Sequence, residues 1–109
     1  MILIYSKKDN KMTRIIYTWH VAPEKLERFI ETWIRTTNRI HTEVKGAQGS
    51  FMLQNDKDTK EIKTIAKWDS LSDWENFWNK SKHYQMESMH KLGERVSVEI
   101  FKEIDDFTR

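Results

Sequence analysis

The chain has 109 residues, of which 12% are aromatic, 33% are charged and none is cysteine, and its formal net charge is +2. This composition predicts one cytoplasmic globular domain with a single core, and the lack of cysteine excludes disulfides, thiol nucleophiles and zinc–thiolate sites. Basic residues are interleaved with acidic ones and no apolar run reaches the roughly 20 residues of a membrane span, so neither nucleic acid nor a membrane is an expected partner.

The first predicted strand follows a short leading segment. Residues 1–12, MILIYSKKDNKM, join an apolar pentad to a polar turn and predict an N-terminal extension, with an ordinary edge strand as the alternative. Residues 13–21, TRIIYTWHV, are β-branched and aromatic, as strands are. Alternation gives this strand two faces, one formed by Ile15, Tyr17, Trp19 and Val21 and the other by Arg14, Ile16, Thr18 and His20.

A helix is predicted over residues 23–44. Pro23 suits a first helical turn, and apolar side chains then recur at helical spacing until Gly46 and Gly49. Residues 49–55 and 61–69 predict two strands of a hairpin around the polar turn DKDTK.

A second helix is predicted from Ser70, with Asp73 completing a capping box, to about residue 91. A break near residues 81–83 is an alternative, and Gly93 marks the end of the helix. Residues 95–104 predict a last strand whose apolar side chains share one face, namely Val96, Val98, Ile100 and Ile104. Residues 105–109 form a polar tail.

The predicted order is β-α-β-β-α-β, which indicates an α+β, ferredoxin-like fold with two helices on one face of a four-stranded antiparallel sheet. The face of the sheet away from the helices would carry Phe101. It would also carry one of the two faces of the first strand, either the one with Ile15 or the one with Ile16. Because an apolar sheet face exposed to water needs a partner, we expect a homodimer in which two sheets face each other.

Three motifs carry a family resemblance. They are V-x-P-E-K at residues 21–25, F-x-x-x-W-x-x-T at residues 29–36 and K-W-D-S at residues 67–70. In order and spacing they resemble the antibiotic biosynthesis monooxygenase family, over residues 13–104. The resemblance implies a dimeric α+β barrel with a pocket between helices and sheet in each subunit. Members oxidise polyphenols or quinols with molecular oxygen and no metal or flavin, and one branch binds and degrades haem.

The segment after the tryptophan strand resembles both branches. Quinol-type members show H-x-x-S-x-H, which matches here at Ser81 and His83 with Trp78 at the first histidine. The haem branch shows W-x-K-S-x-x-F, which matches Trp78 to Ser81 with Tyr84 for phenylalanine. Two other residues of the haem branch are not matched. The position of its axial histidine is Ser88 in this sequence, and the asparagine of its first strand is absent here. The resemblance therefore implies no cofactor, with haem as the alternative.

The second helix carries a stripe that is apolar at its ends and polar in its middle: Trp74, Trp78, Ser81, Gln85, Met89 and Leu92, flanked by Phe77 and Ser88. Polar groups that face inward need partners, so this stripe favours a pocket for an aromatic ligand. The alternative is a plain core in which a kink turns the polar residues to solvent.

Candidate site residues follow from this pocket. We expect Tyr17, Thr18, Trp33, Trp74, Trp78, Ser81 and Gln85 to line it. A histidine is the most suitable base at neutral pH, and His20 and His83 are the candidates. The helical spacing of His83, Glu87 and His90 is compatible with a metal, but a solvated helix face explains it better, and no metal is predicted.

The sequence thus predicts cofactor-free oxidation of a small aromatic or quinol-like compound by oxygen. Haem degradation and non-catalytic binding of a small ligand by a homodimer are the alternatives.

Overall fold

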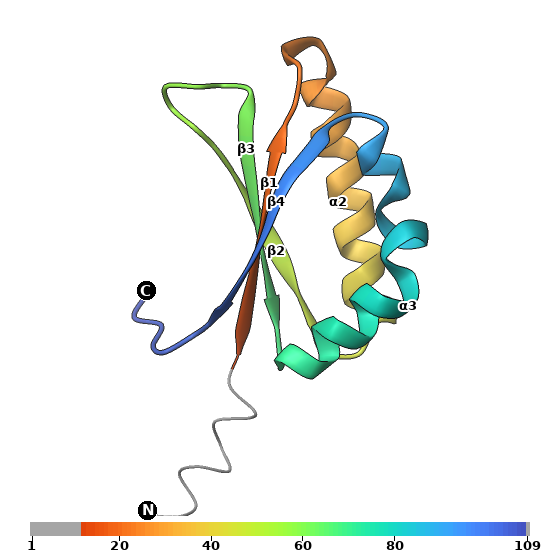
Figure 1. Ribbon diagram of the computed structural model, residues 1–109, viewed down its shortest axis with the longest axis vertical. Helices are drawn as coiled ribbons and strands as arrows, with labels where there is room; N and C mark the ends of the chain where they lie inside the picture. Colours follow the sequence, from red (N-terminus) through yellow and green to blue (C-terminus); the bar gives the residue numbers. More distant parts are fainter. Residues whose placement is uncertain (1–11, 109) are drawn as a thin grey trace, which may run out of the picture.

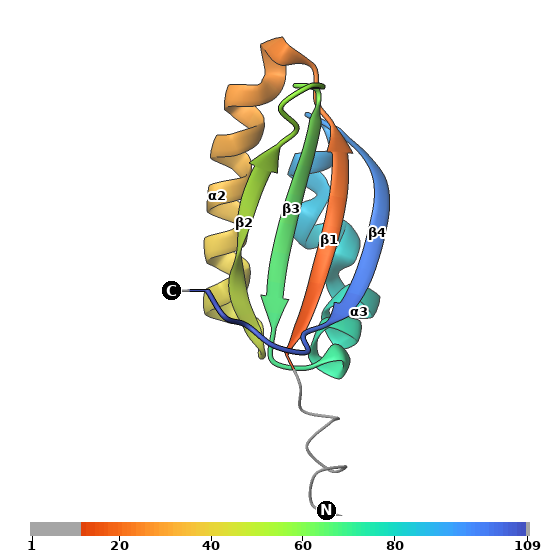
Figure 2. The same cartoon turned by 90° about the vertical axis from the view of Figure 1, so that its left-hand side faces the viewer.

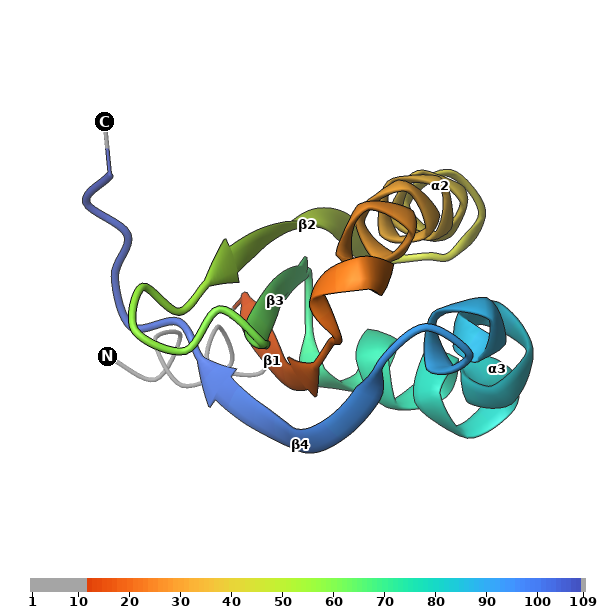
Figure 3. The same ribbon diagram turned by 90° about the horizontal axis from the view of Figure 1, so that it is seen from above.

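The computed structural model describes residues 12–108, apart from the side chains of residues 81–85. Its elements are β1 (Thr13–His20), a 3₁₀ turn η1 (Pro23–Lys25), α2 (Leu26–Glu43), β2 (Ala47–Gln54), β3 (Glu61–Trp68), α3 (Leu71–His90) and β4 (Glu94–Lys102). The strands form one antiparallel sheet in the order β2-β3-β1-β4. Figures 1 and 3 show α2 and α3 together on one side of this sheet. The predicted ferredoxin-like α+β fold is confirmed, and most of the predicted N-terminal extension lies outside the described residues.

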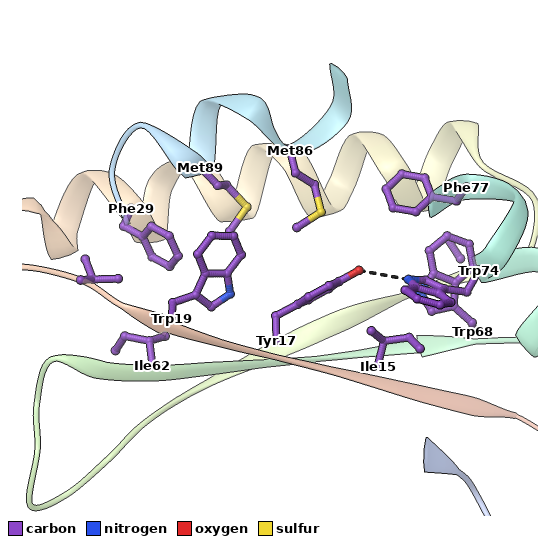
Figure 4. Close-up of a cluster of buried hydrophobic side chains, with 12 residues drawn as sticks. Ile15, Tyr17, Trp19, Phe29, Ile62, Trp68, Trp74, Phe77, Met86 and Met89 are labelled. Atoms are coloured by element: carbon purple, nitrogen blue, oxygen red, sulfur yellow. Dashed lines mark hydrogen bonds between the residues drawn. The ribbon is translucent and has the colours of Figure 1, made fainter. Parts of the chain in front are cut away.

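The inner face of β1 forms the centre of the core. Ile15, Tyr17, Trp19 and Val21 are all buried beneath the helices, as the alternation of the sequence predicts. Figure 4 shows these rings and aliphatic side chains stacked between the sheet and the two helices. Ile15 therefore belongs to the core, and Ile16 is the isoleucine of the opposite face.

The two glycines after α2 adopt backbone conformations that few other residues tolerate. Gly46 and Gly49 have φ values of 87° and 97°, in the region where a Cβ is unfavourable. A Cβ at Gly46 would also overlap the side chain of Asp73, and its carbonyl accepts a hydrogen bond from the Asp69 amide at 2.8 Å. This glycine thus allows the start of β2 to approach the start of α3 closely.

Helix α3 begins as predicted but does not bury a single stripe. The Ser70 hydroxyl accepts a hydrogen bond from the Asp73 amide at 3.2 Å, which confirms the predicted cap. Phe77 and Met86 are both buried. They are nine residues apart, and in a regular helix nine residues span about two and a half turns, so their side chains would point to opposite sides. In Figure 1 the axis of α3 changes direction along its length, which accounts for the difference. The pocket interpretation is therefore wrong at Ser88, which is exposed, as the alternative of a kink that turns polar residues to solvent predicts.

A β-bulge changes the predicted faces of β4. Thr18 pairs with Ser97, whereas Trp19 pairs with Arg95, so Val96 is the extra residue between them. Arg95 therefore shares the helix-covered side with Trp19, and Val96 is 47% exposed. The prediction that Val96 and Val98 act together on one face is wrong, because simple alternation does not include the bulge. Ile104 lies beyond the end of the strand.

The second face of the sheet is apolar and uncovered by helices, as predicted. In Figure 2 this face points toward the viewer, with the helices beside and behind it. Phe51, Leu53 and Phe101 are each about half exposed, and Ile16 and Ile65 lie between them in the register. Among the described residues, no helix is long and apolar enough to cross a membrane.

Candidate functional site

A small cavity lies between the two helices and the sheet. Its volume is about 50 Å³, which holds a few water molecules and is well below the ~300–1,000 Å³ of typical ligand pockets. Its lining combines six aromatic or thioether side chains with small aliphatic residues and a similar number of polar residues. The described residues around it include Tyr17, Trp33, Thr36, Thr37, His41, Thr64, Trp68, Phe77, Met86 and Met89. An aromatic ligand would therefore require these side chains to move apart.

Tyr17 is the most buried polar ring at this cavity. It is 5% exposed, and its hydroxyl oxygen accepts a hydrogen bond from the indole Nε1 of Trp74 at 3.1 Å (Figure 4). Burial raises the pKa of Tyr17 to about 12, and the Trp74 hydrogen bond and the Arg95 charge offset only part of that rise. The phenol is therefore neutral at physiological pH, where it can donate its own hydrogen but cannot serve as a base.

His41, an exposed residue in the last turn of α2, forms part of the lining of the same cavity. Its Nδ1 lies 2.7 Å from the carbonyl oxygen of Ala47, which can only accept a hydrogen bond. Neutral His41 must therefore carry its proton on Nδ1, and Nε2 keeps a free lone pair. Sequence reasoning missed His41; the i, i+4, i+8 row of Trp33, Thr37 and His41 could have indicated it, since all three line the cavity.

On the side of Tyr17 toward β4, Trp78 and Arg95 form a stack. The rings of Tyr17 and Trp78 are nearly parallel, with centroids 6.3 Å apart. The guanidinium carbon of Arg95 lies 4.8 Å from the Trp78 ring centroid and 5.9 Å from that of Tyr17. Burial lowers the pKa of Arg95 below its ordinary value, although the group remains a cation. Sequence reasoning missed Arg95, because the β-bulge alone places it on this face.

The structure brings together part of the predicted site. Tyr17 and Trp33 line the cavity, and Trp74 and Trp78 pack beside Tyr17. Thr18 lies on the opposite face of β1, where its hydroxyl accepts a hydrogen bond from the Lys63 amine at 2.8 Å.

The two predicted bases are not seen at the cavity. His20 is exposed at the end of β1 and lines two open hollows instead. The side chain of His83 lies outside the described residues, as do those of Ser81 and Gln85. Their roles, like those of the other site residues, stay predictions.

The described residues do not fit a haem. Ser88 occupies the position that the haem branch gives to its axial histidine, and it is exposed on the outer side of α3. His90 packs its ring against Trp19, with centroids 5.4 Å apart, at the far end of the helix. The cavity is also much smaller than a porphyrin. Among the described side chains, no group of three potential metal ligands lies together.

Comparison with known proteins gives a family and a set of similar folds. The profile described as antibiotic biosynthesis monooxygenase matches residues 12–86. SnoaB from Streptomyces nogalater, a cofactor-independent oxygenase solved as a point mutant, is 12% identical with a TM-score of 0.72, and the match covers 91% of this chain and 99% of that one.

Two further solved structures are similar. A Bordetella bronchiseptica protein provisionally assigned to the antibiotic biosynthesis monooxygenases is 12% identical with a TM-score of 0.71, covering 86% of this chain and 98% of its own. A conserved Bacteroides thetaiotaomicron protein of unknown function is 16% identical with a TM-score of 0.70, and the match covers 86% of this chain and 99% of that one. No curated protein matched the chain. Together with the fold, the profile match over most of the described residues shows that this chain belongs to the antibiotic biosynthesis monooxygenase family.

Proposed function

We propose that this protein is a cofactor-independent monooxygenase that oxidises a small aromatic or quinol-like compound with molecular oxygen. The observation that carries the proposal is the tautomer of His41, whose hydrogen bond to Ala47 leaves a basic nitrogen free on a residue that lines an aromatic cavity. Membership of the family, and the cofactor-independent activity named for SnoaB, support the same reaction class.

The first step is removal of a proton from a ring hydroxyl of the substrate by Nε2 of His41. A base placed within hydrogen-bond reach of its proton contributes about 10²–10⁴-fold to a rate. Tyr17, neutral and with a hydroxyl hydrogen to donate, would stabilise negative charge that develops on a substrate oxygen. Deprotonation turns the ring into an electron donor strong enough to reduce oxygen.

The second step is electron transfer from this anion to oxygen, followed by bond formation between the resulting radical and superoxide. The ring carbon para to the hydroxyl binds both oxygen atoms, and the outer one takes back the proton held by His41, which gives a hydroperoxide. The O–O bond then breaks, the carbon loses its hydrogen, and the second oxygen leaves as water. The hydroxyarene and one oxygen molecule thus become one quinone and one water, so atoms and electrons balance.

The substrate must open the cavity, because about 50 Å³ is too small for an aromatic ring. Met86 and Met89 are suited to this movement, since both are buried at the cavity and methionine adapts its shape readily. Closely packed apolar walls would also keep water from the anion and the radical.

We further propose that two copies associate through the open sheet face, as expected from sequence. Phe51, Leu53 and Phe101 are about half exposed there, and adjacent exposed apolar side chains mark interaction surfaces. Light scattering at micromolar concentration should give twice 13.2 kDa; a monomer would contradict this.

The domain limits of 13–104, with a tail at 105–109, and a cytoplasmic location stay predictions.

Oxygen uptake by the chelator-treated protein with a panel of phenols and naphthols whose para carbon carries a hydrogen tests the activity. Turnover that depends on the protein, with quinone formed in step with oxygen consumed, is the expected result. If no compound is oxidised above the buffer rate while aromatic compounds still bind, the non-catalytic ligand-binding alternative replaces the proposal. A saturable Soret shift on titration with hemin would instead favour the haem alternative.

A further inference from the structure

Two buried hydroxyl groups lie on neighbouring strands beneath the helices. Tyr17 of β1 and Thr64 of β3 are directly opposite each other in the antiparallel register, so their side chains share one face of the sheet. Both residues are almost fully buried, and both line the cavity described above. A ligand that opens this cavity therefore meets both of them.

Each hydroxyl oxygen accepts a hydrogen bond from a tryptophan. The indole Nε1 of Trp74 donates to Tyr17 at 3.1 Å, and the indole Nε1 of Trp19 donates to Thr64 at 3.2 Å. Because an indole N–H can only donate, the hydroxyl is the acceptor in both pairs. The hydrogen of each hydroxyl must therefore point away from its tryptophan, toward a different acceptor.

The described part of the chain offers no such acceptor, since neither hydroxyl donates a hydrogen bond to any residue in it. Both hydroxyls keep their hydrogens at physiological pH, because burial raises the pKa of Tyr17 to about 12 and threonine does not ionise. Buried donors that lack an acceptor are costly and are normally matched by one. The cavity thus presents two hydrogen-bond donors that a ligand could satisfy.

Both hydroxyls are placed where a ligand in the cavity can reach them. The side chain of Thr64 is so short that its hydroxyl lies beside whichever of its atoms borders the cavity. Figure 4 shows the hydroxyl of Tyr17 at the end of its ring, directed away from β1 and toward the helices. The cavity lies between the helices and the sheet, so neither group has to move to the other face of the sheet.

The geometry points to a binding site for the carbonyl oxygen of an aromatic ketone in this cavity, with Tyr17 and Thr64 as its hydrogen-bond donors. A carbonyl oxygen has two lone pairs and no hydrogen, so it can accept from either hydroxyl or from both. The inference rests on the proposed function only for the aromatic class of the ligand. It adds Thr64, which has no part in the proposed oxidation, as a residue that determines specificity.

Isothermal titration calorimetry of the full chain with acetophenone and ethylbenzene tests the site. The two compounds have nearly the same shape, and only acetophenone carries an acceptor oxygen. Neither has a hydroxyl group, so neither requires His41 as a base or undergoes the proposed oxidation. Acetophenone should bind saturably with one site per chain, and the quantity to compare among variants is the ratio of the two affinities.

Thr64→Val removes the hydroxyl and nearly keeps the shape of the side chain. It should lower the ratio of acetophenone affinity to ethylbenzene affinity by about three- to tenfold, as expected for the loss of one hydrogen bond. Thr64→Ser keeps the hydroxyl and should keep most of the ratio. Both affinities are measured on the same variant, so a partial loss of folded protein cancels in the ratio.

Thr32→Val is the matched control. Thr32 is also buried, and its hydroxyl also accepts one hydrogen bond, from Arg35 at 3.4 Å. Thr32 is not among the described residues that line the cavity. This variant should therefore leave the affinity ratio unchanged.

If acetophenone does not bind saturably, or if Thr64→Val and Thr32→Val have the same effect on the ratio, the proposal is wrong. Thr64 would then serve only as the acceptor for Trp19. A ratio that depends on Thr64, together with no oxygen uptake for any phenol, would contradict the proposed oxidation and leave this binding site in place.

Should Thr64→Val fail to fold, as judged by near-UV circular dichroism, the indole N–H NMR signals of Trp19 and Trp74 in the wild-type protein give the answer. A hydroxyl that donates a hydrogen bond becomes a stronger acceptor. Both signals should therefore move to lower field with acetophenone, and further than with ethylbenzene. Equal movement with the two compounds would overturn the site.

Discussion

The hydroxyl of Tyr17 and the indole nitrogen of Trp74 form a buried hydrogen bond of 3.1 Å between the middle of β1 and the first turn of α3. It connects residues 57 positions apart in the chain. Both rings are almost fully buried, so neither group is open to bulk water. This bond therefore fixes where the first half of α3 lies on the sheet, and with it the position of Trp78.

Replacing Tyr17 by Phe should destabilise the protein, because the indole N–H of Trp74 would remain buried without an acceptor. We expect a loss of about 1–3 kcal/mol in the free energy of unfolding, measured by urea denaturation. A double-mutant cycle with Trp74→Phe isolates the pair. A coupling energy near zero would show that the hydrogen bond does not stabilise the fold.

The raised pKa of Tyr17 predicts a loss of stability at high pH. The unfolded chain ionises near the ordinary value of 10.0, whereas the folded protein holds the proton until about pH 12. Between these values the unfolded state binds fewer protons, so stability falls as pH rises, by on the order of 2–3 kcal/mol in total. Urea denaturation at pH 9 and pH 11.5 should show the drop, and Tyr17→Phe should lack that part of it.

Two glycine substitutions should differ because their surroundings differ. Gly46 and Gly49 have similar positive φ values, but only at Gly46 would a Cβ overlap another side chain, that of Asp73. We expect Gly49→Ala to cost about 1 kcal/mol from backbone strain alone, and Gly46→Ala to cost about 1–3 kcal/mol more. Thermal unfolding measures both. Equal costs would mean that the contact between Gly46 and Asp73 is not tight.

Methionine packing at the cavity gives a further stability prediction. Met89 is 1% exposed and lines the cavity, so Met89→Ala should cost about 2–5 kcal/mol and enlarge the cavity. Met89→Leu nearly conserves volume and should cost less than about 1.5 kcal/mol. If a small aromatic compound raises the melting temperature of Met89→Ala but not of Met89→Leu, the ligand occupies the enlarged cavity; equal shifts would place it elsewhere.

His41 gives the prediction that bears most directly on catalysis. His41→Asn keeps a side-chain N–H that can donate to the Ala47 carbonyl, but it removes the second ring nitrogen. Oxygen uptake should fall by about 10²–10⁴-fold with little change in melting temperature. Added imidazole should partly restore activity in His41→Ala. Full activity in His41→Asn would exclude His41 as the base. The oxygenase proposal would then require another residue to deprotonate the substrate.

Local sequence signals accounted for most of the fold. The alternation along β1 predicted that Ile15, Tyr17, Trp19 and Val21 share one face but left open which face is buried, and Ser70 with Asp73 identified the start of α3. These signals succeed because alternation and capping depend on neighbouring residues in the chain. Helical periodicity likewise placed Trp33 and Trp74 among the apolar positions of the two helices, which pack against the core.

The residues that could carry chemistry depended on tertiary structure. Arg95 reaches Trp78 only because a bulge, set by the pairing of β4 with β1, shifts the alternation of the strand by one residue. The buried face of α3 changes between Phe77 and Met86, along a helix whose axis changes direction, which regular periodicity cannot express. The tautomer of His41 likewise depends on the carbonyl of Ala47 beyond the end of its own helix. Local patterns therefore predicted the elements, whereas register and packing placed Arg95 beside Trp78 and His41 at the cavity, because these contacts join residues that are far apart in the chain.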